Sequence, residues 1–291
     1  SYIEMNNFYT LTVYEKGSEI IRMLYRLLGH ETFTAAVKRY LRQHDGEAAT
    51  IEDFVHAMEQ EGGIDLSQFR LWYSQAGTPV IKVEEQHTEN GYQLILEQHT
   101  PATPDQNEPK RPVHIPVEIA LWNRAGESVH GPVLKEMRQS REVFEFEGLE
   151  TESPETDSPE YNDLETDSLA PSLLRGFSAP VKLDFDLDSE RLMTLVAHET
   201  DAFARWDAVQ TLYIRALESA MDGADPAQCG SQMVTVFEAI LENPPEDMAL
   251  WAELWCLPGE NYLAQRQDAF DPDHVLPVRD EGKRQIANSL Y

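Results

Sequence analysis

The spacing of apolar residues divides the chain into three stretches. Up to residue 78, apolar side chains recur every three or four positions, which is the period of one face of an α-helix. From Pro79 to about residue 187, apolar and polar residues alternate in short runs interrupted by Pro and Gly, as in β-strands joined by turns. The helical period then returns at Asp188. We therefore predict three domains: a helical one at 1–78, a small antiparallel β-sandwich at 79–185, and successive helices at 186–291.

Local signals mark the ends of the first helices. Gly29 follows the first apolar stripe and predicts a helix end. Thr50 and Asp53 have the spacing of an N-cap pair ahead of a third helix, although Asp replaces the better Glu or Gln. A last helix is predicted through Phe69 and should end at Gly77.

The stretch from residue 186 contains four apolar stripes at helical spacing. They predict antiparallel helices joined by short turns, and no fixed-period repeat distinguishes a bundle from a helical solenoid. Trp251 and Trp255 lie four residues apart beside Cys256. We interpret them as a packed helix face rather than a cofactor site.

Composition and charge narrow the classes of function. The chain has 291 residues, of which 41% are hydrophobic, enough to fill the cores of two or three domains. Lys and Arg number 23 against 52 Asp and Glu, a formal charge of −29 that repels phosphates and anionic headgroups. We therefore expect no nucleic-acid partner and no membrane partner. Cys229 and Cys256 cannot make a disulfide framework, which fits a reducing compartment, and we expect the protein to be cytoplasmic.

One segment is strongly acidic. Residues 147–167 contain nine Asp or Glu in 21 positions and almost no large apolar side chains, so we expect a solvated loop. A calcium site is the sharper alternative. The segment lacks the alternating ligand pattern of known calcium loops, which argues against it.

A search for catalytic motifs finds none that stands on spacing alone. His30-Glu31 and His198-Glu199 each begin like a zinc motif, but Thr34 and Ala202 occupy the place of the second histidine. We interpret both histidines as surface residues of helices. No phosphate-binding glycine loop and no Gly-x-Ser-x-Gly elbow is present in the sequence.

Five longer segments carry a resemblance to a known family. They read NNFYTLTVYEKG at 6–17, HDG at 44–46, FR with WYSQAGTP at 69–79, TPATPDQ at 100–106 and FSAPVKL at 177–183. In this order along the chain they resemble the bacterial branch of the aminopeptidase N family of zinc metallopeptidases. The resemblance is specific over residues 1 to about 210.

The resemblance implies a domain plan and a cofactor. The family removes single residues from peptide N-termini with one zinc, held by His-Glu-x-x-His and a more distant Glu. Residues 1–78 would be the helical end of its thermolysin-like catalytic domain, 79–185 its β-sandwich, and 186–291 the first helices of its C-terminal superhelix. The zinc motif lies upstream in the family. We therefore expect this chain to be a fragment of a longer parent that contains zinc, to hold no zinc itself and to be inactive alone.

Tyr14 is the catalytic residue that the resemblance implies. The family's tyrosine donates its phenol proton to the oxyanion of the tetrahedral intermediate, and a phenol with a pKa near 10 stays protonated at pH 7. Asn6 and Tyr9 match positions near the substrate cleft. Glu15 and Lys16 are interpreted as supporting or surface charges. Peptides are the expected substrates of the parent, and the oligomeric state stays open.

Two other readings remain at this point. The chain could be a non-enzymatic module, a sandwich plus helical array that binds a partner protein. A calcium-binding acidic adaptor is a weaker third hypothesis. An intact His-Glu-x-x-His upstream would favour the enzyme.

Overall fold

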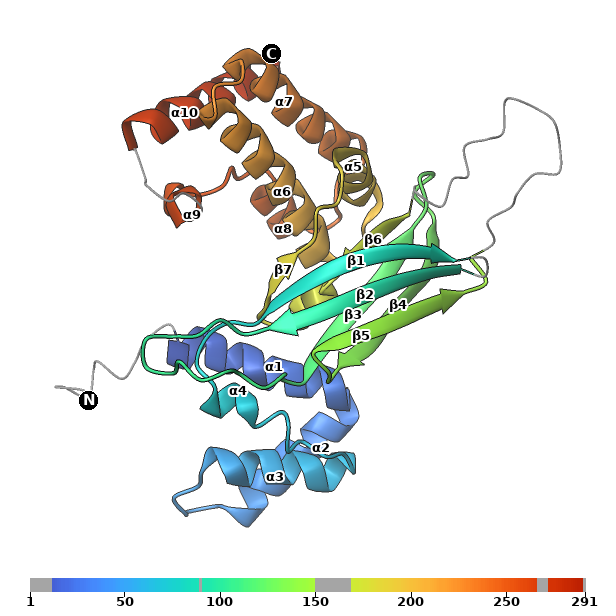
Figure 1. The fold of residues 1–291 in the computed structure, drawn as a ribbon, viewed down its shortest axis with the longest axis vertical. Helices are drawn as coiled ribbons and strands as arrows, with labels where there is room; N and C mark the ends of the chain where they lie inside the picture. The colour runs from blue at the N-terminus through green and yellow to red at the C-terminus, as the bar shows by residue number, and fades with distance from the viewer. Residues whose placement is uncertain (1–11, 89–90, 150–168, 266–271, 290–291) are drawn as a thin grey trace. The chain divides into compact units, whose positions relative to one another are not determined.

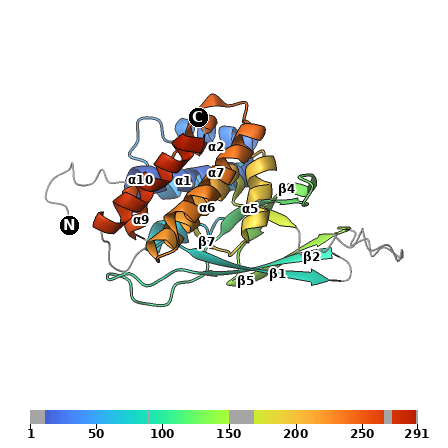
Figure 2. The same cartoon turned by 90° about the horizontal axis from the view of Figure 1, so that it is seen from above.

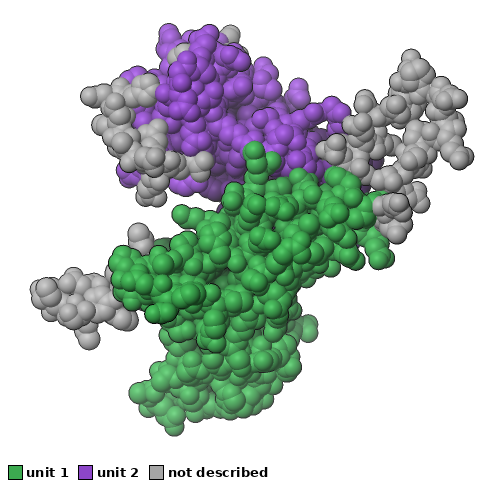
Figure 3. Space-filling model, viewed as in Figure 1, with its two compact units in different colours: residues 1–119, 132–166, 177–186 green, residues 120–131, 167–176, 187–291 purple. Residues whose placement is uncertain are grey.

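The computed structural model describes residues 12–88, 91–149, 169–265 and 272–289 (Figure 1). Asn6, Tyr9 and nearly all of the predicted acidic loop lie outside these residues. The chain forms two compact units, coloured separately in Figure 3. Unit 1 comprises residues 1–119, 132–166 and 177–186, and unit 2 comprises residues 120–131, 167–176 and 187–291.

Unit 1 begins with helices. A π-helical turn, Thr12–Lys16, leads into α1 (Gly17–Leu28), which is followed by α2 (His30–Gln43) and α3 (Ile51–Gly62). Gly29 ends α1 with a φ of 75°, a left-handed conformation that favours glycine, so the predicted helix end is confirmed. The helices bury a shared apolar core that includes Met23, Leu24, Val55, Met58 and Phe69.

The predicted N-cap of α3 is also confirmed. The Asp53 backbone N–H donates to Thr50 Oγ1 at 3.2 Å, and the Thr50 N–H donates to Asp53 Oδ2 at 2.8 Å. Each side chain thus satisfies the other residue's backbone N–H, which is a capping box. The shorter Asp performs the role expected of Glu.

The last helix of this part is shorter than predicted. Only α4 (Leu71–Ser74) is α-helical, and the residues before it form a tight turn. Asp65 accepts a hydrogen bond from the Ser67 N–H at 2.8 Å, and Glu59 accepts one from the Leu66 N–H at 3.0 Å. Because these side chains satisfy the backbone donors locally, the segment through Phe69 gains less from a full α-helix.

Among the residues that the structure describes, seven strands form two sheets. β1 (Val80–Thr88), β2 (Gly91–His99), β5 (Arg141–Glu147) and β7 (Lys182–Asp184) have the order β5-β2-β1-β7. The other sheet has the order β4-β3-β6, with β3 at Ile115–Trp122, β4 at Ser128–Met137 and β6 at Ala170–Leu173. β2 pairs antiparallel with β1 and β5, as expected. The β1–β7 pair is parallel, which the predicted antiparallel pattern missed and which the long connection between these strands permits.

Alternation in β1 shows how the sequence builds the sandwich core. Ile81 and Val83 are buried, whereas Lys82 and Glu84 between and after them are exposed. Val83 pairs with the buried Leu96 of β2. Since side chains alternate between the two faces of a strand, β1 has one apolar face and one charged face.

Unit 2 consists mainly of helices. They are α5 (Ser189–His198), α6 (Ala202–Met221), α7 (Pro226–Glu242), α8 (Met248–Leu254), α9 (Glu260–Gln265) and α10 (Pro272–Ser289). α6, α7 and α10 lie side by side (Figure 2). Within the described residues, no helix has the length and apolar character needed to cross a membrane.

Four helices of unit 2 begin with an aspartate N-cap. An aspartate side chain accepts a hydrogen bond from a backbone N–H of the first turn in each: Asp188 for α5, Asp201 for α6, Asp225 for α7 and Asp247 for α8. Aspartate is a preferred N-cap residue, and its negative charge is also favourable at a helix N-terminus. Part of the chain's strong acidity therefore stabilises helix ends.

Of the two tryptophans near Cys256, Trp255 packs against an aromatic residue of another helix. Trp255 follows the last residue of α8, and its ring meets Phe237 of α7 edge to face at 4.9 Å between centroids. Phe237 in turn stacks on the buried Tyr213 of α6. The aromatic residues thus connect three helices within unit 2.

Candidate functional site

Tyr14 lies on the π-helical turn that precedes α1. Its side chain is 58% exposed. π-helical turns are rare and occur often at functional sites. The structure thus presents Tyr14 at the surface of unit 1, in a backbone conformation compatible with a role in binding or catalysis.

Lys16 connects the π-helical turn to the backbone at Gly77, which is distant in sequence but lies in the same unit. Its Nζ donates a hydrogen bond to the Gly77 carbonyl oxygen at 2.8 Å, across 61 positions of sequence. The lysine is half-buried, and burial lowers the pKa of its ammonium group. Ser18 Oγ also donates to the Glu15 carbonyl at 2.8 Å, which closes the junction between the turn and α1. Lys16 is therefore a structural contact rather than a free surface charge.

Gly77 occupies a position that requires glycine. Its φ is +100°, which side chains with a Cβ rarely adopt. A Cβ at this residue would lie 3.1 Å from Thr100 Cγ2 and 3.2 Å from the Pro101 carbonyl oxygen. The backbone at Gly77 therefore packs directly against the segment 100–106.

Gln106 fixes the chain on the N-terminal side of Gly77. Its Oε1 accepts a hydrogen bond from the Ala76 N–H at 2.9 Å, and its Nε2 donates to the Ser74 carbonyl at 3.1 Å. Lys110 Nζ donates to the same Oε1 at 2.6 Å. The side-chain amide thus satisfies two backbone groups of the 74–79 segment.

Gln75 makes a reciprocal pair with Arg111. Gln75 Nε2 donates to the Arg111 carbonyl at 2.9 Å, and the Arg111 N–H donates to Gln75 Oε1 at 2.8 Å. With the contacts of Lys16 and Gln106, this brings three of the recognised segments, 14–17, 72–79 and 100–106, together around Gly77.

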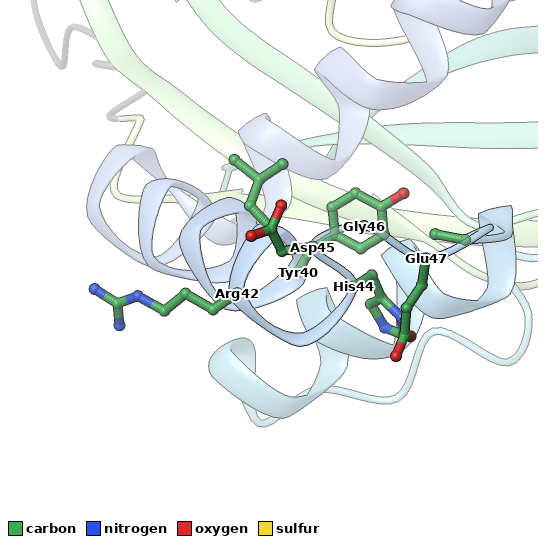
Figure 4. A pocket seen from close by; sticks show the side chains of 8 residues that line it. Tyr40, Arg42, His44, Asp45, Gly46 and Glu47 are labelled. Atoms are coloured by element: carbon green, nitrogen blue, oxygen red, sulfur yellow. The ribbon is translucent and has the colours of Figure 1, made fainter.

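The HDG segment lies elsewhere in unit 1, between α2 and α3. An open depression of about 770 Å³ is lined there by residues 40–47 and 49, with the exception of Gln43. His44 Nδ1 lies 3.5 Å from Glu47 Oε2, but the Arg42 and Asp45 side chains point in other directions (Figure 4). No common point is surrounded by these groups, so the depression is not a candidate active site.

The described residues also contain no group of three or more His, Cys, Asp or Glu side chains placed to hold a metal ion. His30 and His198 are both exposed at the ends of their helices, as predicted. Neither Asn6 nor Tyr9 can be placed relative to Tyr14, because both lie outside the described residues.

The sequence did not indicate that Glu199 is buried in an ion pair. Its Oε1 accepts a hydrogen bond from Arg175 Nη2 at 2.9 Å, and its Oε2 accepts one from Trp122 Nε1 at 3.1 Å. The Glu199 side chain is fully buried and that of Arg175 is 8% exposed. All three residues belong to unit 2, where the pair is a structural element rather than part of a zinc site.

Three family models match successive parts of the chain. Residues 1–73 match the family described as the peptidase family M1 domain. Residues 77–186 match a domain of unknown function (DUF3458) with an Ig-like fold, and residues 189–291 match its companion domain with ARM repeats. The expected sandwich followed by a helical array is thereby confirmed.

The chain belongs to the aminopeptidase N family. It is 39% identical to aminopeptidase N of Escherichia coli over 99% of this chain and 32% of that protein, and 37% identical to aminopeptidase N of Haemophilus influenzae over 99% and 33%. A crystal structure of Legionella pneumophila aminopeptidase A in complex with aspartic acid superposes with a TM-score of 0.81 at 26% identity, over 99% of this chain and 31% of that one. The chain thus spans about a third of the length of these relatives.

Proposed function

We propose that this chain is the part of a zinc-dependent aminopeptidase that contributes the catalytic tyrosine, Tyr14. In this proposal residues 1–78 end the catalytic domain, 79–185 form the sandwich and 186–291 begin the superhelix. The observation that supports it most directly is the match of residues 1–73 to the M1 domain, with Tyr14 exposed on a turn held by Lys16.

The described residues do not fit a zinc site by themselves, since no set of three suitable side chains is brought together among them. In the proposal the zinc ligands belong to a longer protein, of which the relatives' lengths give a measure. The 291-residue chain would then bind no zinc and release no residue from a peptide, and the parent would act on peptides in the cytoplasm.

Tyr14 would act as a hydrogen-bond donor. As water attacks a peptide carbonyl, negative charge develops on its oxygen, and a phenol O–H aimed at that oxygen stabilises the charge. The ground-state carbonyl carries less charge, so the bond is stronger in the transition state and acts on kcat more than on KM. Peptides enter the proposal as substrates because the relatives are aminopeptidases.

The direct test is Tyr14→Phe in the full open reading frame that encodes this chain. The variant keeps the ring and loses one hydroxyl, so packing should be unchanged. Loss of one such donor costs about 10²–10³-fold in kcat. We expect that loss with unchanged zinc content and melting temperature. A variant that keeps more than about a third of the wild-type kcat, well above the donor-loss range, would remove Tyr14 from catalysis.

Two measurements on the 291-residue chain complete the test. Elemental analysis should find far less than one zinc per chain, and an aminoacyl reporter substrate should stay intact. A reading frame without His-Glu-x-x-His upstream would instead favour the non-enzymatic interaction module. Stoichiometric zinc in the chain itself would contradict the proposal that the ligands lie elsewhere.

A further inference from the structure

The contact between Lys16 and Gly77 links the candidate catalytic turn to the entrance of the sandwich. Lys16 is the last residue of the π-helical turn and lies two positions after Tyr14. Its ammonium group reaches the Gly77 carbonyl at 2.8 Å, although 61 positions of chain separate them. Figure 1 shows the start of α1 close to the connection between α4 and β1, where Gly77 lies.

The backbone around the Gly77 carbonyl, which accepts this bond, is restrained by several contacts. Gly77 has a left-handed backbone, and the atoms 3.1 and 3.2 Å from its would-be Cβ belong to Thr100 and Pro101. Gln106 binds the backbone of the residues just before it at Ala76 and Ser74. Since little freedom remains for the Gly77 peptide, its carbonyl oxygen is a well-fixed acceptor for the Lys16 ammonium group.

The donor is suited to such a role. Lysine has a long, flexible side chain that usually remains in water, so its half-buried position here is informative. A charge-assisted hydrogen bond is about twice as strong as a neutral one, and partial exclusion of water strengthens it further. The bond thus replaces the hydration that the ammonium loses.

We propose that Lys16 is a positioning residue for Tyr14: its bond to the Gly77 carbonyl fixes the end of the π-helical turn and, through it, the direction of the phenol hydroxyl. The inference rests on the proposed function of Tyr14. It assigns no contact between Lys16 and substrate. A displacement of about 1 Å at a catalytic group can cost about 10²-fold in rate, so a modest loosening of the turn should be measurable.

The contact itself can be tested on the 291-residue chain without any activity. Hydrogen exchange, followed by mass spectrometry, would compare Lys16→Met with Lys38→Met, which removes an exposed ammonium from α2. Loss of one hydrogen bond should speed exchange of the amides around residues 14–20 by about 2–10-fold, with no change in the Lys38→Met chain. Equal exchange in both variants would overturn the inference.

The consequence for catalysis is tested in the full-length enzyme by a double-mutant cycle. Lys16→Met should lower kcat about 10-fold or more and leave KM within about twofold, because the loss acts on transition-state stabilisation. In a Tyr14→Phe background the same change should cost less than about twofold, since the hydroxyl that it positions is already gone. Lys16→Arg, which keeps a cationic donor, should recover part of the loss.

The outcomes separate this inference from the proposed function. If Tyr14→Phe leaves kcat unchanged, the proposed role of Tyr14 fails whatever Lys16 does. If Tyr14→Phe is impaired but Lys16→Met costs the same factor in both backgrounds, or nothing, Lys16 does not act through Tyr14. Should Lys16→Met fold poorly, Lys16→Gln provides the same cycle with a shorter polar side chain, and the same two criteria apply.

Discussion

Arg70 holds Glu59 with two parallel hydrogen bonds, from Nη1 to Oε1 at 2.7 Å and from Nη2 to Oε2 at 3.0 Å. The pair joins α3 to the turn before α4, and Glu59 also accepts the Leu66 N–H at 3.0 Å. The Glu59 and Arg70 side chains are 21% and 25% exposed, so water competes only in part. The Arg70 hydrogen bonds lower the pKa of Glu59.

We expect Glu59→Gln to lower the free energy of unfolding at pH 7 by about 1.5–3 kcal/mol, the range for hydrogen bonds to charged groups. Because the folded-state pKa of Glu59 is depressed, its contribution is full above the unfolded value of about 4.3 and is lost as pH falls through the folded value. The urea midpoints of wild type and variant should therefore differ at pH 7 and approach each other as the pH falls below about 4.3. The matched control is Glu52→Gln, which removes the exposed partner of the same guanidinium and should cost less than about 1 kcal/mol. Equal costs for both variants would contradict the prediction.

His114 predicts a second pH dependence. Its side chain is fully buried, and Nε2 lies 2.9 Å from Glu136 Oε2. Burial lowers the pKa of His114, with the positive charge of Arg138 acting in the same direction and Glu136 opposing both. The unfolded chain therefore binds this proton at higher pH than the folded one.

The free energy of unfolding should therefore decrease as the pH falls and the unfolded chain takes up this proton. Stability from a neutral, buried His114 is full above about pH 6.5 and is lost as pH falls through the folded pKa. We expect His114→Gln to flatten the loss of stability between pH 7.5 and 5, measured by chemical denaturation. His99→Gln, at an exposed position near the end of β2, should leave the wild-type slope unchanged. Parallel pH profiles for wild type and His114→Gln would show that this histidine does not titrate with unfolding.

The Glu199–Arg175 pair should be sensitive to loss of one partner. Glu199→Gln would remove the buried carboxylate that accepts hydrogen bonds from Arg175 and Trp122, and breaking a buried ion pair costs about 3–5 kcal/mol. The exposed Arg124–Glu190 pair in the same unit serves as control, and Glu190→Gln should cost less than about 1 kcal/mol. Thermal unfolding of both variants measures the difference. A melting temperature for Glu199→Gln close to that of Glu190→Gln would refute the expectation.

The same pair predicts where a helical fragment can begin. Trp122 and Arg175 lie in the residues matched by the Ig-like domain, yet they bind Glu199 within unit 2. A fragment of residues 187–291 would therefore expose the buried Glu199 carboxylate. We expect it to lack a cooperative unfolding transition by circular dichroism, whereas the whole chain should show one for this unit. A sharp transition in the fragment would mean that the segments 120–131 and 167–176 are dispensable.

Local sequence patterns predicted the parts of the fold that depend on neighbours in the chain. The end of α1 at Gly29 and the Thr50–Asp53 cap follow from interactions within a few residues, and both are present. The helix through Phe69 was overestimated, because the acceptor Glu59 that competes for the Leu66 N–H comes from the preceding helix. Apolar spacing contains no information on such a contact.

In the candidate site too, the sequence indicated some features and missed others. Tyr14 could be identified only from the segment around it, since one exposed tyrosine has no distinguishing pattern. The bond from Lys16 to the Gly77 carbonyl and the bond from Arg175 to the Glu199 carboxylate join polar groups that are 61 and 24 positions apart. The spacing of apolar residues predicts which face of a helix or strand is apolar. It does not predict hydrogen bonds between elements, because these depend on how the elements pack against one another.

The polar contacts around Gly77 also bear on how this chain can be recombined with a relative. A chimera that exchanged the sandwich at Pro79 would take residues 74–76 from one parent and Gln106 and Arg111 from the other. Gln106 serves two backbone groups, and Gln75 depends on the Arg111 peptide rather than on its side chain. A sandwich graft that begins before residue 71 would keep both glutamines with their partners, so the exchangeable segment is longer than the sandwich and includes α4 and the approach to β1.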